Sequence, residues 1–253
     1  MKPPPSHAED LVDQVVELVD ALTPEGSPEA PAHLWYVCYG SNMSLQRLTY
    51  YLGGGRPPAG ALTYPGCRDS SPPSDSRAIR LPGTVYFALE ARAWTGGMAF
   101  YDHDHFGGTP ARAFRVTVSQ FSDIMAQEMC LEPGDDIDLS GVMGRGRLTL
   151  GPGCYQTLLH LGVLDGLPAF TFTSPWRSHE VEHRKPAAVY LRHLAVGLAE
   201  AHQWSPVRIA AYLSSRPGAV GSWTPEEIRL LLSEDGTVTA SQADEEERSC
   251  IPG

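Results

Sequence analysis

The chain has 253 residues, 42% of them hydrophobic, which is enough to build the core of one main domain. Its formal net charge of -11 at pH 7, with no Lys/Arg cluster, argues against nucleic acid as a partner. Residues 1–5 lack the apolar segment of a signal peptide, and no apolar run is long enough to span a bilayer. We therefore expect a cytoplasmic protein with no membrane partner.

The five cysteines are scattered, and no two of them have the CxxC spacing. This pattern predicts neither a disulfide framework nor a structural zinc site. No segment repeats with a period of about 20 to 50 residues, which argues against a solenoid or a propeller. We expect a single irregular domain without a metal or another cofactor.

The first predicted elements are a helix, a linker and a strand. Residues 8–23 carry apolar side chains at helical spacing, and a Pro/Gly-rich linker completes an N-terminal segment over 1–33. Residues 34–39 are aromatic and β-branched, which is typical of a buried strand, and a helix is predicted over 43–52. Residues 53–83 are rich in Gly, Pro, Ser and Asp, so we expect a long surface excursion with little regular structure.

Strands are predicted next, over residues 84–89, 97–101 and 112–118. The last two are joined by a turn-rich segment and are expected to form a hairpin. Residues 119–129 are expected to form a short helix capped by Ser119 or Ser122, which places Glu128 one turn beyond an apolar face. Residues 131–153 are interpreted as an insertion.

The C-terminal part begins with two strands, over residues 154–163 and 168–173. A helix starting at Pro186 and a second over 207–213 follow. Residues 214–239 form a helical extension, in which Thr224 and Glu227 have the spacing of a capping box. Residues 240–253 are expected to be a disordered acidic tail.

One loop could bind an anion. A strand that ends in Tyr39-Gly40-Ser41-Asn42 and turns directly into a helix would present backbone N–H groups and the positive end of the helix dipole at one point. Such a point suits a carboxylate or an oxyanion. Gly-Ser-Asn is also the sequence of an ordinary turn, so this motif alone leaves both interpretations open.

Three motifs, in order, are similar to those of the γ-glutamylcyclotransferase-like superfamily, and the resemblance covers about residues 34–213. The family has an apolar strand ending in Tyr-Gly-Ser-Asn, a Trp-x-Gly-Gly-x-Ala strand, and a strand leading to a turn with a catalytic Glu. The corresponding segments here are Tyr36-Val37-Cys38-Tyr39-Gly40-Ser41-Asn42, Trp94-Thr95-Gly96-Gly97-Met98-Ala99, and residues 113–118 leading to Glu128.

The resemblance implies an α+β fold, a small mixed β-barrel with peripheral helices, over residues 34–213. It implies an enzyme that cyclises a γ-glutamyl group to 5-oxoproline and releases an amine or amino acid, without a metal. Glu128 would be the general acid/base, with a pKa raised by apolar neighbours. The substrate would be bound by Tyr36, Val37, Cys38, Tyr39, Gly40, Ser41, Asn42 and Tyr155.

The chain departs from the family pattern in several places. Met129 stands where a Gly usually follows the catalytic Glu, Ile124-Met125 replaces the usual Leu-Asp pair, and Phe170 stands where some members have a tyrosine. These changes leave the leaving group open: a γ-glutamyl amino acid, a γ-glutamylamine or a γ-glutamyl-protected biosynthetic intermediate. The sequence does not define the oligomeric state.

Two other functions compete with the cyclotransferase hypothesis. Asp102-His103-Asp104-His105 is compatible with a metal-dependent hydrolase, since Asp102, His103 and His105 could be ligands, although a polar turn explains the same residues. A non-catalytic binding module on the same fold is the second alternative. Cys38 lies within an apolar strand and Ser41 lacks the G-x-S-x-G pattern, so neither is favoured as a nucleophile.

Overall fold

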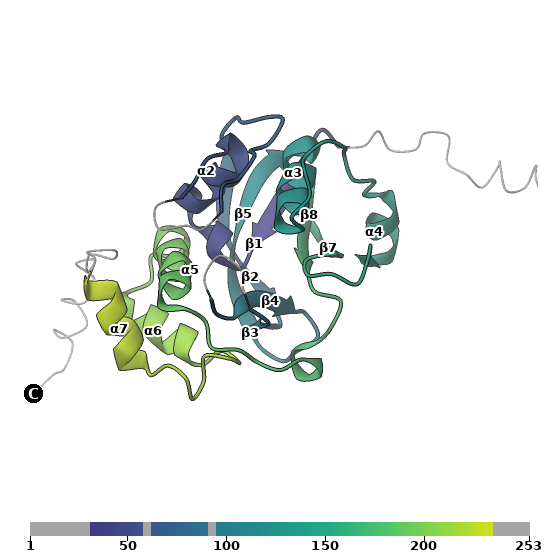
Figure 1. The fold of residues 1–253 in the computed structure, drawn as a ribbon. Coiled ribbons are helices and arrows are strands. Elements are labelled where there is room, and N and C mark those ends of the chain that lie inside the picture. Colours follow the sequence, from purple (N-terminus) through teal and green to yellow (C-terminus); the bar gives the residue numbers. More distant parts are fainter. Residues whose placement is uncertain (1–30, 58–61, 91–94, 235–253) are drawn as a thin grey trace, which may run out of the picture. The chain divides into compact units, whose positions relative to one another are not determined.

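The structure is a computed structural model that describes residues 31–57, 62–90 and 95–234 (Figure 1). From His33 onward these residues belong to one compact unit. The helix predicted over 8–23 and the tail over 240–253 lie outside the described residues, as does Trp94 of the second motif. Within the described part, no helix combines the length and the apolar character needed to cross a membrane.

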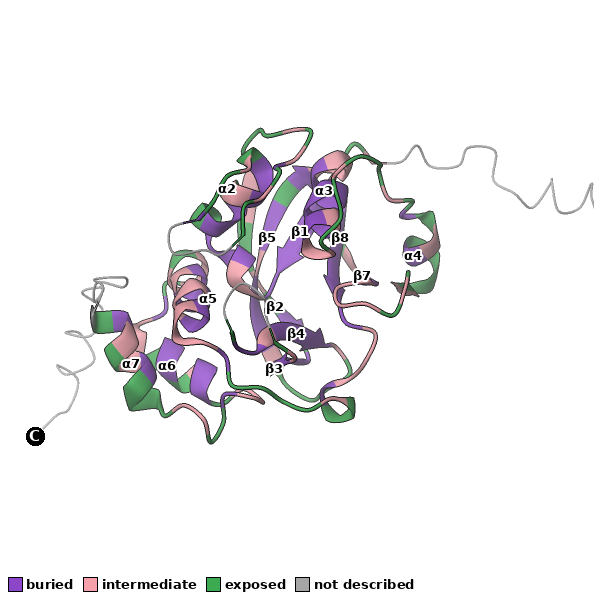
Figure 2. Ribbon diagram, in the orientation of Figure 1, coloured by how far each residue is buried: buried purple, intermediate pink, exposed green. Residues whose placement is uncertain are grey.

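A six-stranded mixed sheet forms the centre of the unit. β1 (His33–Cys38) lies inside it, antiparallel to β5 (Gly108–Thr117) on one side and parallel to β8 (Leu167–Thr173) on the other. Five of the six residues of β1 are buried, and Figure 2 shows that much of the neighbouring strands is buried as well. The strands, in their order across the sheet, are β2 (Asp75–Pro82), β5 (Gly108–Thr117), β1 (His33–Cys38), β8 (Leu167–Thr173), β7 (Thr157–Leu164) and β6 (Arg147–Thr149). The α+β class with a mixed sheet is confirmed.

A second, two-stranded sheet consists of β3 (Thr84–Ala88) and β4 (Met98–Asp102). The hairpin predicted between the second and third strands of this region is therefore wrong, because β4 pairs with β3 while β5 pairs with β1 and β2. Thr173 joins the two sheets: its hydroxyl accepts the N–H of Tyr101 at 2.9 Å and donates to the Tyr101 carbonyl at 2.9 Å. The strands of the expected barrel are thus distributed over two sheets linked through β4 and β8.

The two segments expected to lack regular structure contain some. β2 lies within residues 53–83 and pairs with β5 over its whole length. It is an edge strand in which only Leu81 is buried, so the apolar alternation that marks a strand is weak. Residues 131–153 contain α4 (Ser140–Arg145) and the short β6.

The helices α2 (Leu45–Gly53) and α3 (Val118–Glu128) are in contact; α2 follows the turn after β1, and α3 starts beside the amino end of β1, where Thr117 pairs with His33. The N-cap of α3 is Thr117, not Ser119 or Ser122. Its hydroxyl accepts the N–H of Gln120 at 3.1 Å, and the Gln120 side chain accepts the Thr117 N–H at 3.0 Å. This reciprocal pair forms a capping box. The sequence analysis missed it because it considered only serines at the predicted helix start.

Three helices end the described chain: α5 (Ala188–His202), α6 (Pro206–Ser214) and α7 (Pro225–Glu234). The starts of all three agree with the sequence prediction to within about two residues, which is ordinary for helix ends. The capping box of α7 is present, since Glu227 donates its N–H to the Thr224 hydroxyl at 3.2 Å and accepts the Thr224 N–H at 2.7 Å. α7 packs on α5 and α6.

Candidate functional site

A cavity of about 670 Å³ lies where β1 ends, between α2, α3 and β4. It is lined by residues from segments that are far apart in the sequence. Every residue that the sequence analysis assigned to the site is among them: Tyr36, Val37, Cys38, Tyr39, Gly40, Ser41, Asn42, Glu128 and Tyr155. The predicted loop and the predicted carboxylate thus line the same cavity.

The loop after β1 differs from the expected direct turn into a helix. Ser41–Met43 form a single 3₁₀ turn, and α2 begins only at Leu45. The Leu45 N–H donates to the Glu200 carboxylate at 3.0 Å, and Arg112 pairs with the same carboxylate at 2.8 Å. The expectation that this helix end would bind a ligand is therefore wrong, because a carboxylate of the protein already occupies it.

The backbone of the loop still offers donors to the cavity. In the part of the chain that the structure describes, no hydrogen-bond partner accepts the amide N–H groups of Gly40, Ser41 and Asn42. Gly40 has a φ of −110°, so its backbone does not require glycine. A Cβ at this position would lie 3.6 Å from the Tyr190 hydroxyl and 3.7 Å from the Ala99 Cβ, so the missing side chain leaves space for a ligand near the amides.

Glu128, the last residue of α3, faces this loop. Its Oε1 accepts a hydrogen bond from the Asn42 side-chain amide at 3.0 Å, and the same amide lies 3.2 Å from the Tyr36 hydroxyl. Burial raises the pKa of the Glu128 carboxyl, while hydrogen bonding from Tyr51 and Asn42 and the charge of Arg47 act against this rise. A carboxyl group with a raised pKa beside a hydrogen-bond-donating loop is suited to proton transfer near neutral pH.

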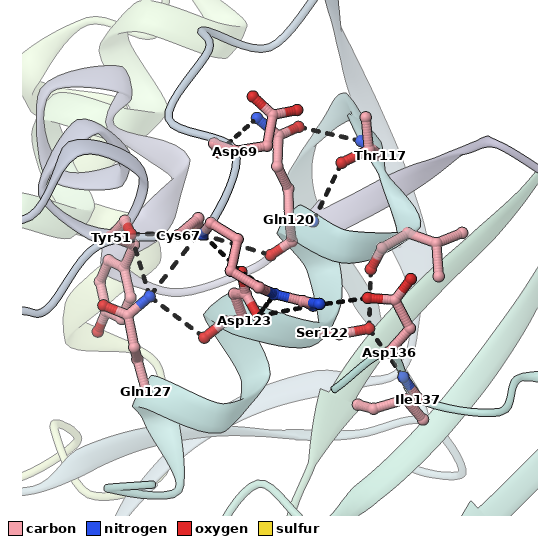
Figure 3. Close-up of polar contacts among 12 residues, drawn as sticks. Tyr51, Cys67, Asp69, Thr117, Gln120, Ser122, Asp123, Gln127, Asp136 and Ile137 are labelled. Atoms are coloured by element: carbon pink, nitrogen blue, oxygen red, sulfur yellow. Dashed lines mark hydrogen bonds and ion pairs between the residues drawn. The ribbon is translucent and has the colours of Figure 1, made fainter. Parts of the chain in front are cut away.

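Polar contacts along α3 fix the helix that presents Glu128 (Figure 3). The fully buried Asp123 carboxylate accepts the backbone N–H of Arg68 at 2.8 Å and its side-chain Nε at 3.0 Å. Arg68 also pairs with Asp136 at 2.6 Å, which ties the insertion to the same helix. One residue before Glu128, the Gln127 amide donates to the Tyr51 carbonyl of α2 at 3.0 Å. These contacts define the direction in which the last turn points.

Sequence reasoning missed an arginine and two tyrosines in the cavity wall. Arg47 is buried, and its guanidinium lies 5.2 Å from the centre of the Tyr51 ring and 4.7 Å from that of Tyr64, whose hydroxyl it also contacts. Arg47 and Tyr51 are four residues apart on α2, a spacing that places both on one face. The sequence does not indicate that an arginine in an amphipathic helix is buried. The contact with Tyr64 arises only in the folded structure.

Tyr155 lines the cavity with its backbone at a φ of 59°. Its hydroxyl donates to the Ala99 carbonyl at 3.0 Å, and its ring stacks on Phe100 with centroids 5.1 Å apart. Phe170 is fully buried in the core, where it packs against Phe121 with centroids 6.0 Å apart. Phe170 is therefore a core residue and does not line the cavity.

The residues of the hydrolase hypothesis belong to a separate cluster. Asp102 accepts the Ser178 N–H at 2.9 Å, His103 lies 3.0 Å from the Arg177 guanidinium, and the exposed His105 contacts its neighbour's carbonyl at 2.7 Å. A guanidinium thus occupies the place where a metal would have to bind. The described residues contain no group of three or more His, Cys, Asp or Glu side chains that could hold a metal ion. Burial also raises the pKa of the Cys38 thiol well above its usual value, which disfavours a thiolate nucleophile.

The hydrogen bond between Asn42 and Glu128 gives the first prediction. Replacing Asn42 by alanine removes an interaction that lowers the pKa of Glu128, so that pKa is expected to rise further. NMR titration of the Glu128 carboxyl carbon measures it directly. Tyr36→Phe, which removes only the partner hydroxyl of Asn42, is the control and should cause a smaller change. An unchanged or lower pKa in Asn42→Ala would show that the contact does not stabilise the carboxylate.

No family model matches the sequence. Over 202 residues the chain is 28% identical to histone deacetylase 5 of Arabidopsis thaliana, an alignment that covers 73% of this chain and 31% of that protein. The chain thus spans about a third of the length of the curated relative that it matches.

Similar folds occur among solved structures. An uncharacterized human protein has a TM-score of 0.42 and 13% identity, with 87% of this chain and 99% of that chain covered. A γ-glutamyl cyclotransferase has a TM-score of 0.40 and 13% identity, with 86% and 98% covered. YkqA of Bacillus subtilis has a TM-score of 0.38 and 17% identity, with 74% and 56% covered. Likeness at this level carries no information about a reaction, so a function has to be inferred from the site itself.

Proposed function

We propose that the chain is a cytoplasmic γ-glutamylcyclotransferase, which converts a γ-glutamyl group to 5-oxoproline and releases an amine. The observation that supports this most directly is the position of Glu128, whose carboxylate meets the Tyr36–Asn42 loop through the 3.0 Å hydrogen bond from Asn42. A proton-transfer group and a set of backbone donors then share one cavity. These are the two components that the cyclisation requires.

In the proposed reaction, the α-amine nitrogen of the substrate attacks its own γ-carbonyl carbon, and a new C–N bond closes the five-membered lactam. Glu128 accepts a proton from the attacking amine and delivers one to the leaving nitrogen as the original amide C–N bond breaks. Intramolecular attack has a high effective molarity when the geometry is held, so positioning supplies much of the acceleration. No metal or redox cofactor takes part in this scheme.

The loop and Arg47 have separate roles in this proposal. The amide N–H groups of Gly40, Ser41 and Asn42 would stabilise the negative charge that develops on the γ-carbonyl oxygen. The buried guanidinium of Arg47, next to Tyr51, would bind the α-carboxylate of the glutamyl unit. Glu128 has to be deprotonated to accept the proton, and its raised pKa keeps it basic enough to do so.

A panel of γ-glutamyl compounds tests the proposal. The full chain is incubated with γ-glutamyl amino acids and γ-glutamylamines, and 5-oxoproline is quantified by mass spectrometry. Formation of 5-oxoproline together with an equal amount of free amine supports the reaction. Binding of these compounds without any product would instead favour a non-catalytic module on this fold.

A further inference from the structure

The cavity is larger than a γ-glutamyl group requires. Its volume of about 670 Å³ falls within the range of about 300–1,000 Å³ that is typical of pockets for drug-sized ligands. The lactam product, 5-oxoproline, is far smaller than such a ligand. A substantial part of the space is therefore available to the group that is released.

Apolar side chains line the cavity from the loop after α2, the end of β3, β4 and the end of α3. Leu62, Leu89, Met98 and Met129 all contribute to it, and none of the four is buried by the rest of the protein. Methionine side chains adapt to ligands of irregular shape. Burying such accessible apolar surface against an apolar ligand lowers the free energy of the complex.

The backbone around this region is strained. Leu89, Cys130 and Tyr155 have φ values of 54°, 58° and 59°, a region that non-glycine residues rarely adopt, and all three line the cavity. Such conformations persist where surrounding structure enforces them, and they cluster at functional sites. The leucine at position 89 is thus held at the cavity wall at an energetic cost.

The charges of the lining residues favour a particular class of leaving group. Arg47, the basic residue among the described lining residues, lies beside Tyr51 and Tyr64 and is assigned above to the α-carboxylate. Near Leu89, the described charged lining residue is Glu90, which pairs with Arg184 at 2.5 Å. Among the described lining residues near Leu89, a second carboxylate would lose water without gaining a cationic partner, because Arg184 already pairs with Glu90.

We infer that the released group is a hydrophobic amine without a carboxylate, an alkylamine or arylamine that is held by Leu62, Leu89, Met98 and Met129. This inference rests on the proposed cyclisation and specifies its substrate class. The atoms balance as in any such cyclisation: the γ-glutamylamide gives 5-oxoproline and the free amine, with the proton returned by Glu128.

Two matched substrates test the inference with the full chain. γ-Glutamyl-phenethylamide and γ-glutamyl-phenylalanine differ only in the carboxylate of the leaving group. We expect kcat/KM for 5-oxoproline release to be at least about tenfold higher for the phenethylamide. Equal or faster release from γ-glutamyl-phenylalanine would overturn the inference while leaving the cyclisation intact. Release from neither compound would overturn both.

Two variants locate the subsite. Leu89→Asn introduces a residue that tolerates positive φ but removes the apolar surface. The value of kcat/KM for the phenethylamide should therefore fall about tenfold. Leu230→Asn, at an exposed position on α7 away from the cavity, is the matched control. Leu62→Lys adds a cation at a side chain that is 41% exposed and should raise kcat/KM for γ-glutamyl-phenylalanine. Unchanged ratios in both cavity variants, with wild-type melting curves, would overturn the assignment.

Discussion

Replacing Glu128 by glutamine is expected to lower kcat by about 10²- to 10⁴-fold, because the amide cannot accept a proton from the attacking amine or deliver one to the leaving nitrogen. Glutamine has nearly the same shape and can still accept the hydrogen bond from Asn42 through its carbonyl oxygen. Substrate affinity should therefore be retained. Single-turnover measurement of 5-oxoproline and calorimetric titration with the same γ-glutamyl compound separate the two effects.

The control is Glu132→Gln, which makes the same substitution at an exposed glutamate four residues further along the chain. It should leave both turnover and affinity unchanged. Turnover that survives in Glu128→Gln would contradict the acid/base role. A parallel loss of affinity and turnover would instead mean that Glu128 serves mainly to hold the loop.

The same variant has an expected effect on stability. Burial raises the pKa of Glu128, so the folded state binds its proton more tightly than the unfolded state does. The free energy of unfolding of the wild type should therefore fall as pH rises from the usual carboxyl range through the raised pKa. Glu128→Gln lacks this dependence and should gain stability relative to the wild type over that window. Urea unfolding of both proteins at a series of pH values measures the difference.

The sequence predicted the position of the loop and of Glu128 in the fold where local signals agreed with each other. The apolar strand before Gly40, the helix before Met129, and the order of the motifs placed the loop and Glu128 correctly relative to the strands. A strand that is buried on both faces has a strong sequence signal, and β1 is of that kind. The residues that line the cavity because they belong to a single motif, such as those of the loop after β1, could therefore be named from the sequence.

The remaining features of the site depend on contacts between distant segments. Glu200 on α5 meets the N-terminus of α2, and Tyr64 meets Arg47, yet neither partner is marked by any local pattern. The pairing of β4 with β3 could not be derived from the turn-rich residues after β4, because a turn does not determine which neighbour a strand selects. These contacts are decided by packing, and the contact of Glu200 with the Leu45 N–H is the reason that the proposal relies on the loop amides and not on the helix end.

Gly197→Ala is expected to destabilise the protein by about 1–3 kcal/mol, although alanine is the better helix former by about 1 kcal/mol in a helix interior. A Cβ at position 197 of α5 would lie 2.4 Å from the Cβ of Met43 and 2.9 Å from the backbone of Met43 and Ser44. The Cβ and backbone atoms that it would contact cannot rotate away. The helix therefore has to move away from the 3₁₀ turn that carries Asn42. Urea unfolding measures the loss of stability, and NMR titration detects the altered pKa of Glu128.

A matched substitution shows whether the effect comes from this contact. Gly53 ends α2 with no atom within 4 Å of its would-be Cβ, so Gly53→Ala should stabilise the protein, by up to about 1 kcal/mol. If Gly197→Ala were instead as stable as Gly53→Ala and left the pKa of Glu128 unchanged, α5 would have room to adjust. The close packing of α5 on the turn would then not be what holds Asn42 against the carboxylate. Opposite signs for the two glycines would show that the cost at position 197 comes from its contact with the turn and not from the loss of a helical glycine.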